Sequence, residues 1–579
     1  MVEELKIYIE QGRFHEARVL ANQLVEAGEN SEIFWILNAT LYQIEGTRAA
    51  EYACISRGLQ VNPSNYELYF MLGNYLRESN INQAYLCYEQ ALFYCKDEND
   101  TLLIKEQLDN VMQSGKCEVH PASIVVLSYN IVDILKGCIE SIRENNPASA
   151  YELVVVDNAS TDGAAEWLKE QKDIVLACNT ENKGFAKGCN QGIKMASTEN
   201  DIMLLNNDTI VPPNALFWLR MGLYERDAVG AVGPLTNCAA NNQMVMQQFE
   251  TMEEYFALAR SLCIPQPNPY ENKVWLVGFA MLIKRRALDD VGLLDSRYEW
   301  GNYEDNDYGM KLSAAGYELL LCYNSYIYHY GSLNMGKDKD KYAHFIEENK
   351  QKFIEKWGCD ISYYSGARLD LIRLIEASPN TSMNILEIGC GCGSTLARIK
   401  YLFPNANVYG VEIQPEVAKF GTHLADIIVG NIETMQLPYD TQMFDYIIFG
   451  DVLEHLREPE RAVKRMKQYL KPGGNVIASV PNIMNISVLV ALLKGRFQYY
   501  NNGLLDRTHI HFFTRKELIK MFEECGFKVQ RLCINAACEH LTEEDNELIE
   551  AIYQLPGIAD VEQFQAYQYM ALAKLKDGE

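Results

Sequence analysis

The spacing of hydrophobic and polar positions changes once along the chain, near residue 118. Up to about residue 115, apolar residues recur every three to four positions, which is the period of amphipathic helices. From about residue 121 onward, short runs rich in Val, Ile and Leu alternate with helical stretches. Such runs are typical of buried parallel strands, so the pattern predicts a helical region followed by α/β domains.

The helical region contains pairs of similar residues that lie 34 positions apart. The pairs are Ala50 and Ala84, Trp35 and Tyr69, Leu37 and Met71, and Cys54 and Tyr88. This interval is that of tetratricopeptide repeats, in which small residues let paired helices approach and large ones fill the gaps. A plain helical bundle is the alternative. Because helical repeats often bind peptides, a protein partner at this region is a further expectation.

Two α/β units follow, each with its own set of predicted strands. The first set lies at residues 123–127, 153–156 and 202–205, and the second at 384–388, 408–411, 446–449, 475–479, 527–532 and 567–574. The predicted domains are a repeat region at 1–115, an α/β domain at 121–345, a helical connector at 346–362 and a second α/β domain at 363–579.

Composition and charge narrow the possible partners and location. The 579 residues are 48% hydrophobic and carry a net charge of −26, which disfavours binding to nucleic acid or anionic lipid. The 16 cysteines are scattered, as expected for free thiols in a reducing cytosol. We find no signal peptide, and the longest apolar run, at 486–493, is too short to cross a membrane. We expect a cytoplasmic protein without a transmembrane segment, with peripheral membrane attachment as an alternative.

Acidic residues stand at the ends of the predicted strands in the first α/β unit. Asp157 ends one strand, Asp208 follows another, and Glu304, Asp305 and Asp307 form a third group. Open α/β sheets bind ligands at the carboxyl ends of their strands. Each acid alone is equally compatible with a helix cap or a turn.

The first unit resembles the inverting GT-A glycosyltransferases of family two, which include rhamnosyltransferase-like enzymes. The resemblance covers most of residues 121–335 and rests on short motifs. The motifs are at residues 128–130, 157–162, 182–190, 206–208 and 304–307. It implies a GT-A fold, a hexosyltransferase activity, a nucleoside-diphosphate sugar as donor, and Mg²⁺ or Mn²⁺ as cofactor.

The resemblance also assigns roles to individual residues. It places the nucleotide sugar on Asn130, Asp157, Asn182, Gly184 and Asp208, with Asp157 at the base. Asp208 would bind the metal as the last acid of the family's DxD motif, whose first acid is Asn206 here. Asp305 would act as the catalytic base, with Glu304 beside it. His329 would provide a further metal or phosphate contact, or else serve only the fold.

A glycine-rich turn follows the first predicted strand of the second unit. Gly389, Gly391 and Gly393 would let a ligand approach the backbone. Glu387 stands beside this turn, where it favours the cationic amino group of S-adenosylmethionine over the pyrophosphate of NAD. Glu412 ends the next strand and can accept hydrogen bonds from ribose hydroxyls, as in NAD enzymes also.

The second unit resembles the class I methyltransferases over nearly its whole length. The matching segments are residues 387–393, 412, 430–433, 444–456, 470–474 and 481–482. By this resemblance the fold is Rossmann-like with an antiparallel final strand pair. S-adenosylmethionine would contact Glu387, Gly389, Gly391, Gly393, Glu412, Asn431 and Asp451, with Asn431 at the adenine. His455 or His509 would deprotonate an acceptor hydroxyl, or else tie down a loop.

These features predict a bifunctional transferase of surface-glycan biosynthesis. It would transfer a sugar with inversion to a glycan or glycoprotein acceptor and methylate a hydroxyl, most simply on the same glycan. Two alternatives stay open: an interaction scaffold with one inactive catalytic unit, and an NAD-dependent, sugar-modifying second unit.

Overall fold

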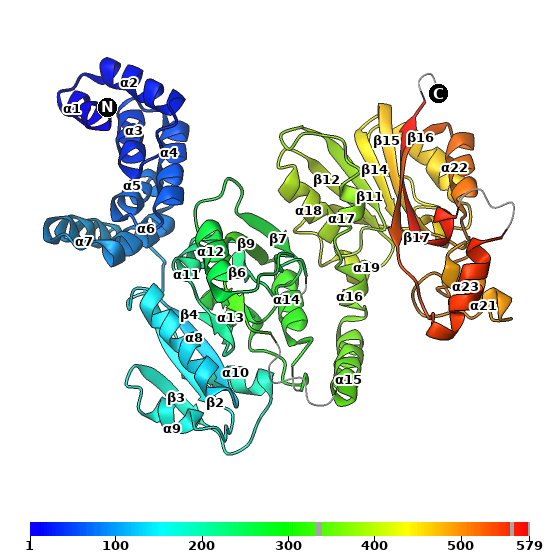
Figure 1. Cartoon of the computed structure of the whole chain (residues 1–579), viewed down its shortest axis with the longest axis horizontal. Coiled ribbons are helices and arrows are strands. Elements are labelled where there is room, and N and C mark those ends of the chain that lie inside the picture. The colour runs from blue at the N-terminus through cyan, green and yellow to red at the C-terminus, as the bar shows by residue number, and fades with distance from the viewer. Residues whose placement is uncertain (240, 300, 332–338, 556–560, 577–579) are drawn as a thin grey trace. The chain divides into compact units, whose positions relative to one another are not determined.

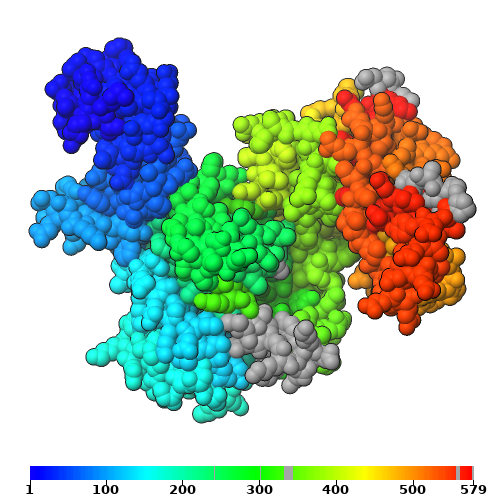
Figure 2. All heavy atoms as spheres, viewed as in Figure 1, coloured from blue at the N-terminus to red at the C-terminus, as the bar shows by residue number. Residues whose placement is uncertain are grey.

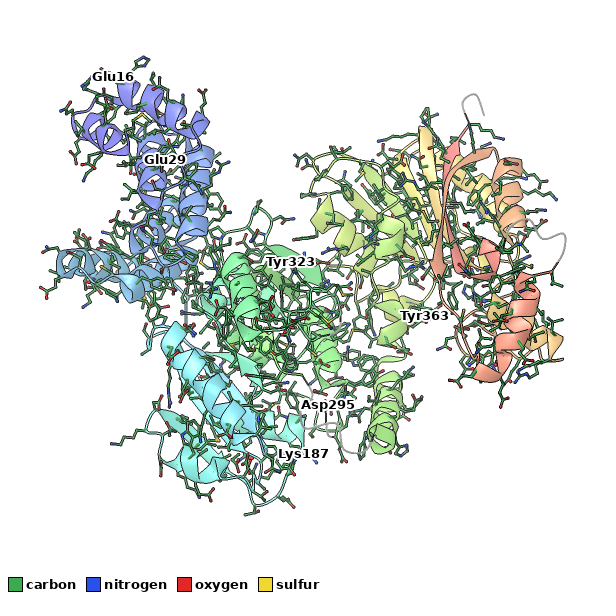
Figure 3. All side chains as sticks on the ribbon, viewed as in Figure 1. Glu16, Glu29, Lys187, Asp295, Tyr323 and Tyr363 are labelled. Carbon is green, nitrogen blue, oxygen red and sulfur yellow. The ribbon has the colours of Figure 1, made fainter. Side chains whose placement is uncertain are left out.

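The structure, a computed structural model, describes residues 1–239, 241–299, 301–331, 339–555 and 561–576. It consists of two compact units, Met1–Trp357 and Gly358–Glu579, which we treat one at a time (Figure 1). In both, side chains fill the space between sheets and helices (Figure 3). None of the helices in the described part of the chain combines the length and apolar character needed to cross a membrane.

The first unit begins with helices stacked in hairpins. They are α1 (Val2–Glu10), α2 (Phe14–Glu26), α3 (Glu32–Ile44), α4 (Arg48–Val61), α5 (Tyr66–Leu76), α6 (Ile81–Tyr94) and α7 (Glu98–Gln113). Trp35 and Tyr69 are each the fourth residue of their helix, in α3 and α5. Gly73 is required where α5 meets α6, because a Cβ there would lie 2.5 Å from the Tyr88 ring. The helical region is thus confirmed, while its assignment to the tetratricopeptide family stays a prediction.

Helix α6 packs directly on α11 (Ala215–Leu223) of the following α/β domain, so the two regions share a surface (Figures 1 and 2). Glu89 and Arg220 form a buried ion pair across this contact. Gln83 donates a hydrogen bond to the Met221 carbonyl (2.9 Å), and the Tyr69 ring meets Phe217 edge-on. Because these groups are buried, the helical region is an integral part of the first unit.

The α/β part of the first unit is built on one mixed sheet of order β3-β2-β1-β4-β8-β6-β9-β7. Its first four strands are parallel, β8 and β7 run antiparallel to their neighbours, and β5 pairs with β10 separately. The strands are β1 (Ala122–Ser128), β2 (Tyr151–Asp157), β3 (Ile174–Cys178), β4 (Asp201–Asn206), β5 (Thr209–Ile210), β6 (Val229–Leu235), β7 (Tyr270–Lys273), β8 (Ala280–Ile283), β9 (Glu318–Tyr326) and β10 (Tyr328–His329). The remaining helices are α8 (Val132–Asn145), α9 (Ala164–Lys169), α10 (Phe185–Met195), α12 (Met252–Leu262), α13 (Arg285–Val291), α14 (Glu304–Ala314) and α15 (Lys339–Trp357).

The second unit has a sheet of order β13-β12-β11-β14-β15-β17-β16, with helices on both faces (Figure 1). The final pair is antiparallel, as predicted. Its strands are β11 (Asn384–Ile388), β12 (Asn407–Glu412), β13 (Asp426–Val429), β14 (Phe444–Gly450), β15 (Leu470–Pro481), β16 (Phe527–Ala536) and β17 (Ala566–Leu575). Its helices are α16 (Ile361–Tyr364), α17 (Leu369–Ile372), α18 (Ser394–Leu402), α19 (Pro415–Ala418), η1 (Leu453–His455), α20 (Pro459–Met466), η2 (Lys467–Tyr469), α21 (Ile486–Leu493), α22 (Arg515–Glu524), η3 (Glu543–Asp545), α23 (Asn546–Tyr553) and η4 (Glu562–Phe564).

The predicted multidomain fold class is confirmed: a helical N-terminal region precedes two α/β domains, each built on one sheet with parallel and antiparallel strands. The apolar run at 486–493 forms α21, whose Ile486 and Val490 are buried while Leu492 and Leu493 are exposed. The domain boundaries proposed from the sequence stay predictions.

Candidate active sites

The strand ends of the first sheet bring two sequence-predicted residues to one edge. In the parallel register, Ser128 of β1 lies opposite Asp157 of β2, and Leu127 lies opposite Asn206 of β4. Neighbouring strands are about 4.8 Å apart, so Asp157 and Asn206 flank β1 at about 10 Å from one another. Both are therefore at the carboxyl edge, where open α/β sheets hold ligands.

Asp157 sits in a loop pocket built by its own chain neighbours. Its Oδ2 accepts a hydrogen bond from the Ser160 amide (3.1 Å), and Asn130 accepts one from the Thr161 amide (2.7 Å). Asn130 has a left-handed backbone with φ 51°, which lets its side chain turn toward this loop. Asp157 is buried, and its Oδ1 has no hydrogen-bond partner in the described chain. That oxygen therefore keeps unused hydrogen-bonding capacity at the edge of the sheet.

A second loop at this edge is held by amide side chains. Asn158 donates to Asn182 Oδ1 (2.8 Å), which also accepts from the Gly184 amide (2.9 Å). Gly184 has φ 80° and leads into α10. Asn182 and Gly184 are thus joined to the Asp157 loop through Asn158, a residue that the sequence reasoning passed over as part of a motif.

Asp208 and His329 are brought together, although 121 positions separate them in the chain. His329 Nε2 lies 3.2 Å from Asp208 Oδ1 and 3.4 Å from Asn206 Nδ2. Its Nδ1 lies 2.9 Å from the Cys238 carbonyl, which can only accept, so Nδ1 carries a proton. Burial, the largest single influence, lowers the pKa of His329, but the hydrogen bond with Asp208, the charge of Asp208 and the Cys238 carbonyl together raise the pKa above its ordinary value.

The donor set at this point fits a divalent cation. One carboxylate, one amide and one imidazole lie together at the strand ends, and such mixed oxygen and nitrogen ligands suit Mn²⁺, with Mg²⁺ favouring the oxygens. His329 Nε2 faces Asp208 Oδ1. A cation bound by both atoms would replace the proton that otherwise joins them. Asn206, in place of the family's first acid, lowers the charge of the site but keeps an oxygen ligand.

Glu304 and Asp305 begin helix α14. Asp305 Oδ2 accepts from the Gly278 amide (3.0 Å), and its Oδ1 accepts from the Asn306 amide (2.8 Å). Burial raises the pKa of Asp305, and these hydrogen bonds moderate the rise. Burial, followed by the charge of Asp305, raises the pKa of Glu304 well above its ordinary value. Glu304 Oε2 has no hydrogen-bond partner in the described structure.

The adjacent residues Gly278 and Phe279 connect the candidate base, Asp305, to the candidate metal ligands. Gly278 donates to Asp305, and the next residue, Phe279, accepts through its carbonyl from the Asn206 amide (2.8 Å). The Phe279 ring stacks on His329 with centroids 5.0 Å apart. Asp305, Asn206 and His329 therefore border the same short segment, at the sheet edge that also holds Asp157.

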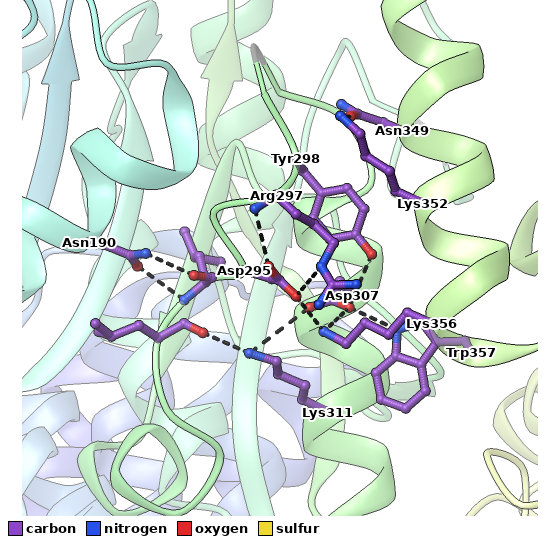
Figure 4. A network of polar contacts seen from close by, with 12 residues as sticks. Asn190, Asp295, Arg297, Tyr298, Asp307, Lys311, Asn349, Lys352, Lys356 and Trp357 are labelled. Atoms are coloured by element: carbon purple, nitrogen blue, oxygen red, sulfur yellow. Dashed lines mark hydrogen bonds and ion pairs between the residues drawn. The ribbon is translucent and has the colours of Figure 1, made fainter.

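Helix α15 clamps the segment that precedes Glu304 (Figure 4). Asn349, 1% exposed, donates to the carbonyls of Glu299 (3.0 Å), Gly301 (3.0 Å) and Asn302 (3.3 Å). At the end of α15, Lys356 pairs with Asp307 (2.6 Å) and Asp295 (2.8 Å), and Trp357 Nε1 donates to Asp307. Asp307, which the sequence grouped with Glu304 and Asp305, thus belongs to the packing of α15.

The glycine turn of the second unit has the predicted shape. Gly389, Gly391 and Gly393 have φ of 71°, 55° and 77°. A Cβ at Gly391 would lie 2.6 Å from the Tyr364 carbonyl oxygen, so no larger residue fits. Burial raises the pKa of Glu387 to about 8, and its Oε2 has no hydrogen-bond partner in the described part of the unit. A cationic ligand group would satisfy this carboxylate.

The other predicted cofactor residues surround the turn. Glu412 accepts from the Gly391 amide (2.9 Å) and from the Gln414 amide (2.9 Å). Asn431 Oδ1 accepts from the Glu433 amide (2.8 Å), which shapes the loop after β13. Both acceptor groups keep a second lone pair for a ligand.

Asp451 follows β14 and is held by two partners. Arg368 Nη1 donates to its Oδ2 (2.5 Å), and the Ser479 hydroxyl donates to its Oδ1 (2.6 Å). Arg368 also pairs with Asp370 (2.8 Å). The sequence reasoning missed Arg368, because a lone arginine before a short helix carries no recognisable pattern.

His455 and His509 are brought together, with ring centroids 4.9 Å apart. Glu454 is the third member of this cluster. The sequence assigned no role to it and included it only in the matching segment at 444–456. Its position immediately before His455 was the available signal. Leu504, whose carbonyl lies 3.1 Å from His509 Nδ1, helps line a pocket together with Tyr500, Arg496 and Glu539.

Fold and sites together define a chain with two transferase domains. Residues 123–292 match a family model described as glycosyl transferase family 2, and residues 362–532 match one described as a methyltransferase domain. The chain is an enzyme that carries a glycosyltransferase domain and a methyltransferase domain. The latter implies S-adenosylmethionine as methyl donor.

Individual relatives cover one domain each. A demethylmenaquinone methyltransferase of Bacillus cytotoxicus is 24% identical over 234 residues, which is 36% of this chain and 97% of that protein. One from Staphylococcus aureus is 27% identical over 187 residues, 28% of this chain and 76% of the relative. The structure of GalNAc-T7 with UDP, GalNAc and Mn²⁺ is 15% identical, covers 44% of this chain and about half (52%) of its own, and has a TM-score of 0.34. A SAM-dependent methyltransferase from Archaeoglobus fulgidus is 20% identical, covers 39% and 98%, and has a TM-score of 0.27.

Proposed function

We propose that the first unit transfers a sugar from a nucleoside-diphosphate donor to a glycan or glycoprotein hydroxyl with inversion. The observation that supports it most is the meeting of Asp157, Asp208, His329 and Asp305 at one sheet edge. Asp157 binds the nucleoside, and Asn182 and Gly184 shape the donor loop. A divalent cation held by Asn206, Asp208 and His329 supplies neutralising charge for the leaving diphosphate.

Asp305 takes the proton of the acceptor hydroxyl in this proposal. The hydroxyl oxygen then bonds to the anomeric carbon as the bond to the diphosphate breaks, and attack from the opposite face inverts that carbon. A positioned carboxylate contributes about 10²–10⁴ in rate to such a step. Burial raises the pKa of Asp305, which favours its action as a base.

A donor screen tests this proposal. Full-length protein with Mn²⁺ is incubated with a panel of nucleoside-diphosphate sugars and acceptor glycans, and products are identified by mass spectrometry. We expect transfer from one donor and its loss in Asp305→Asn, with Asp289→Asn, an exposed acid on α13, as control. If no donor is consumed while the methyltransferase unit works, the scaffold alternative with one inactive unit gains ground.

For the second unit we propose S-adenosylmethionine-dependent O-methylation of the same glycan. Buried Glu387, whose Oε2 has no hydrogen-bond partner among the described residues, favours a cationic cofactor over the pyrophosphate of NAD. Linking the two activities in one chain raises their effective concentration for successive steps. We further propose a cytoplasmic role in surface-glycan assembly, with the helical region recruiting a protein partner.

Labelled S-adenosylmethionine tests the coupling. We expect the label in the glycan only after sugar transfer has occurred, and we expect S-adenosylhomocysteine but not NADH to bind the chain. Methyl incorporation that is independent of the sugar step would contradict the coupling.

A further inference from the structure

A compact cluster of metal-ligating groups lies in the second unit, outside the predicted metal site. Glu454 and His455 are on η1, directly after β14, and His509 comes from a loop more than 50 residues later. One ligand atom from each of the three lies within 4.8 Å of the others. The chain thus folds back to place two imidazoles and a carboxylate around one point.

The hydrogen bonds of the two histidines leave the same ring atom available in each. His455 Nδ1 lies 3.2 Å from the Thr508 carbonyl, and His509 Nδ1 lies 3.1 Å from the Leu504 carbonyl. A carbonyl can only accept, so both Nδ1 atoms carry the proton and both Nε2 atoms keep a lone pair. Histidine ligands of metals are usually held in this way, by a backbone carbonyl on the other nitrogen.

Glu454 provides an independent indication of a ligand. Its side chain is 1% exposed, and neither carboxylate oxygen has a hydrogen-bond partner among the described residues. The neighbouring Arg368 is engaged by Asp370 and Asp451, and Asp451 adds negative charge close by. Buried polar groups are almost always partnered, so an unpartnered carboxylate at this point indicates a ligand.

We propose that Glu454, His455 and His509 bind a divalent transition cation that holds the acceptor hydroxyl for methylation. Two nitrogens and one carboxylate suit Zn²⁺, Fe²⁺ or Co²⁺ better than Mg²⁺ or Ca²⁺. Three protein ligands leave positions open for an oxygen of the substrate. The second half of this proposal rests on the O-methyltransferase function proposed above; the metal site itself does not.

In this proposal the cation takes over the role that a histidine base would have in deprotonating the acceptor hydroxyl. A hydroxyl bound to the cation is acidified and releases its proton to solvent. Its oxygen then bonds to the methyl carbon of S-adenosylmethionine, the carbon–sulfur bond breaks, and the electron pair stays on sulfur in S-adenosylhomocysteine. The rest of the acceptor would occupy the pocket lined in part by Leu504, the residue whose carbonyl accepts the hydrogen bond from His509.

Cobalt binding tests the site in the full-length chain. To remove the first unit's cation site, the background carries Asp208→Asn and His329→Gln. Co²⁺ is titrated after chelator treatment, and binding is followed by the visible d–d absorption and by calorimetry. We expect one equivalent to bind with an absorption typical of nitrogen ligands, and Glu454→Gln or His455→Gln to weaken binding by more than about 100-fold. His511→Gln, a change in the same loop outside the cluster, serves as the control and should bind as the background does.

Separate readouts distinguish the failure of each proposal. Unfolding temperatures show that the variants are folded, and S-adenosylhomocysteine titration reports the cofactor site independently of cobalt. Absence of Co²⁺ binding in the background chain, or equal binding in Glu454→Gln, overturns the metal site. Normal Co²⁺ binding without S-adenosylhomocysteine binding leaves the metal site intact and overturns the methyltransferase function instead. If both bind but glycan methylation by chelator-treated enzyme is unaffected by added metal, the role in holding the acceptor is overturned.

Discussion

Replacing Asn349 by Leu tests whether helix α15 positions the base candidate. The Asn349 amide faces three carbonyls, of which that of Gly301 is buried and the other two are partly buried, and its two hydrogens satisfy at most two of them well. Losing these two hydrogen bonds lowers the stability of the segment by about 2–4 kcal/mol. Asn302 and Tyr303 are left-handed, with φ of 70° and 71°, which costs about 1–2 kcal/mol each. The hydrogen bonds of Asn349 thus offset a similar cost of the left-handed backbone at residues 302 and 303. Without Asn349 these residues can return to an ordinary backbone conformation, which displaces Asp305.

The kinetic consequence is specific. Misplacing a catalytic group by about 1 Å costs about 10²-fold, so we expect kcat for sugar transfer to fall by about 10- to 100-fold. The KM for the donor should change little, since Asp157 and Asp208 lie on other elements. Gln351→Leu, an exposed change on the same helix, is the matched control. If Asn349→Leu lowers the unfolding temperature but keeps the wild-type kcat, Asn349 only stabilises the helix and the reasoning is refuted.

Three further predictions follow from buried charges. Because burial raises the pKa of Glu387 to about 8, binding of a cationic cofactor should release a proton near pH 7. S-adenosylhomocysteine should therefore bind more tightly as the pH rises toward 8. Calorimetry in two buffers should detect the released proton in the wild type and no proton release in Glu387→Gln. Because burial raises the pKa of Glu304, the folded state holds that proton more tightly than the unfolded state, so its contribution to stability is present below about pH 4.5 and is lost as the pH rises through the folded pKa. Glu304→Gln should therefore raise the unfolding temperature at pH 8 and not at pH 4, while the exposed Glu299→Gln changes neither; an equal effect at both values would contradict this. Arg220→Ala should destabilise the chain by about 3–5 kcal/mol in urea unfolding, because it leaves Glu89 buried without its partner, and adding Glu89→Leu should recover much of the loss; no recovery would show that packing dominates.

Much of the fold could be predicted from the sequence because its strands are continuous apolar runs. Residues 124–126 and 153–156 are buried in the middle of a parallel sheet that is covered on both faces, which favours apolar side chains at every position. The mixed half of the first sheet was not predicted. Strands β7 (Tyr270–Lys273) and β8 (Ala280–Ile283) have four residues each, too few for any period to emerge.

The candidate sites were predictable where one motif carries the chemistry, and not where distant segments meet. Asp157 and Gly391 stand in recognisable local patterns at strand ends. The contact between Asp208 and His329 depends on the pairing of β5 with β10, which no local pattern encodes. Asn349 gave a weaker signal of its buried position. It lies four positions before the buried Phe353, and the two residues therefore share the face of α15 that turns inward.

The acidic group at residues 304–307 shows how neighbouring carboxylates take different roles. Asp305 accepts a hydrogen bond from Gly278 at the sheet edge, next to the segment that also contacts Asn206. Asp307 lies on the other side of the same helical turn, fully buried against Lys356 and Trp357. One turn of α14 therefore joins the base candidate to the anchor of α15, and a change at the anchor must act on the base through the backbone they share.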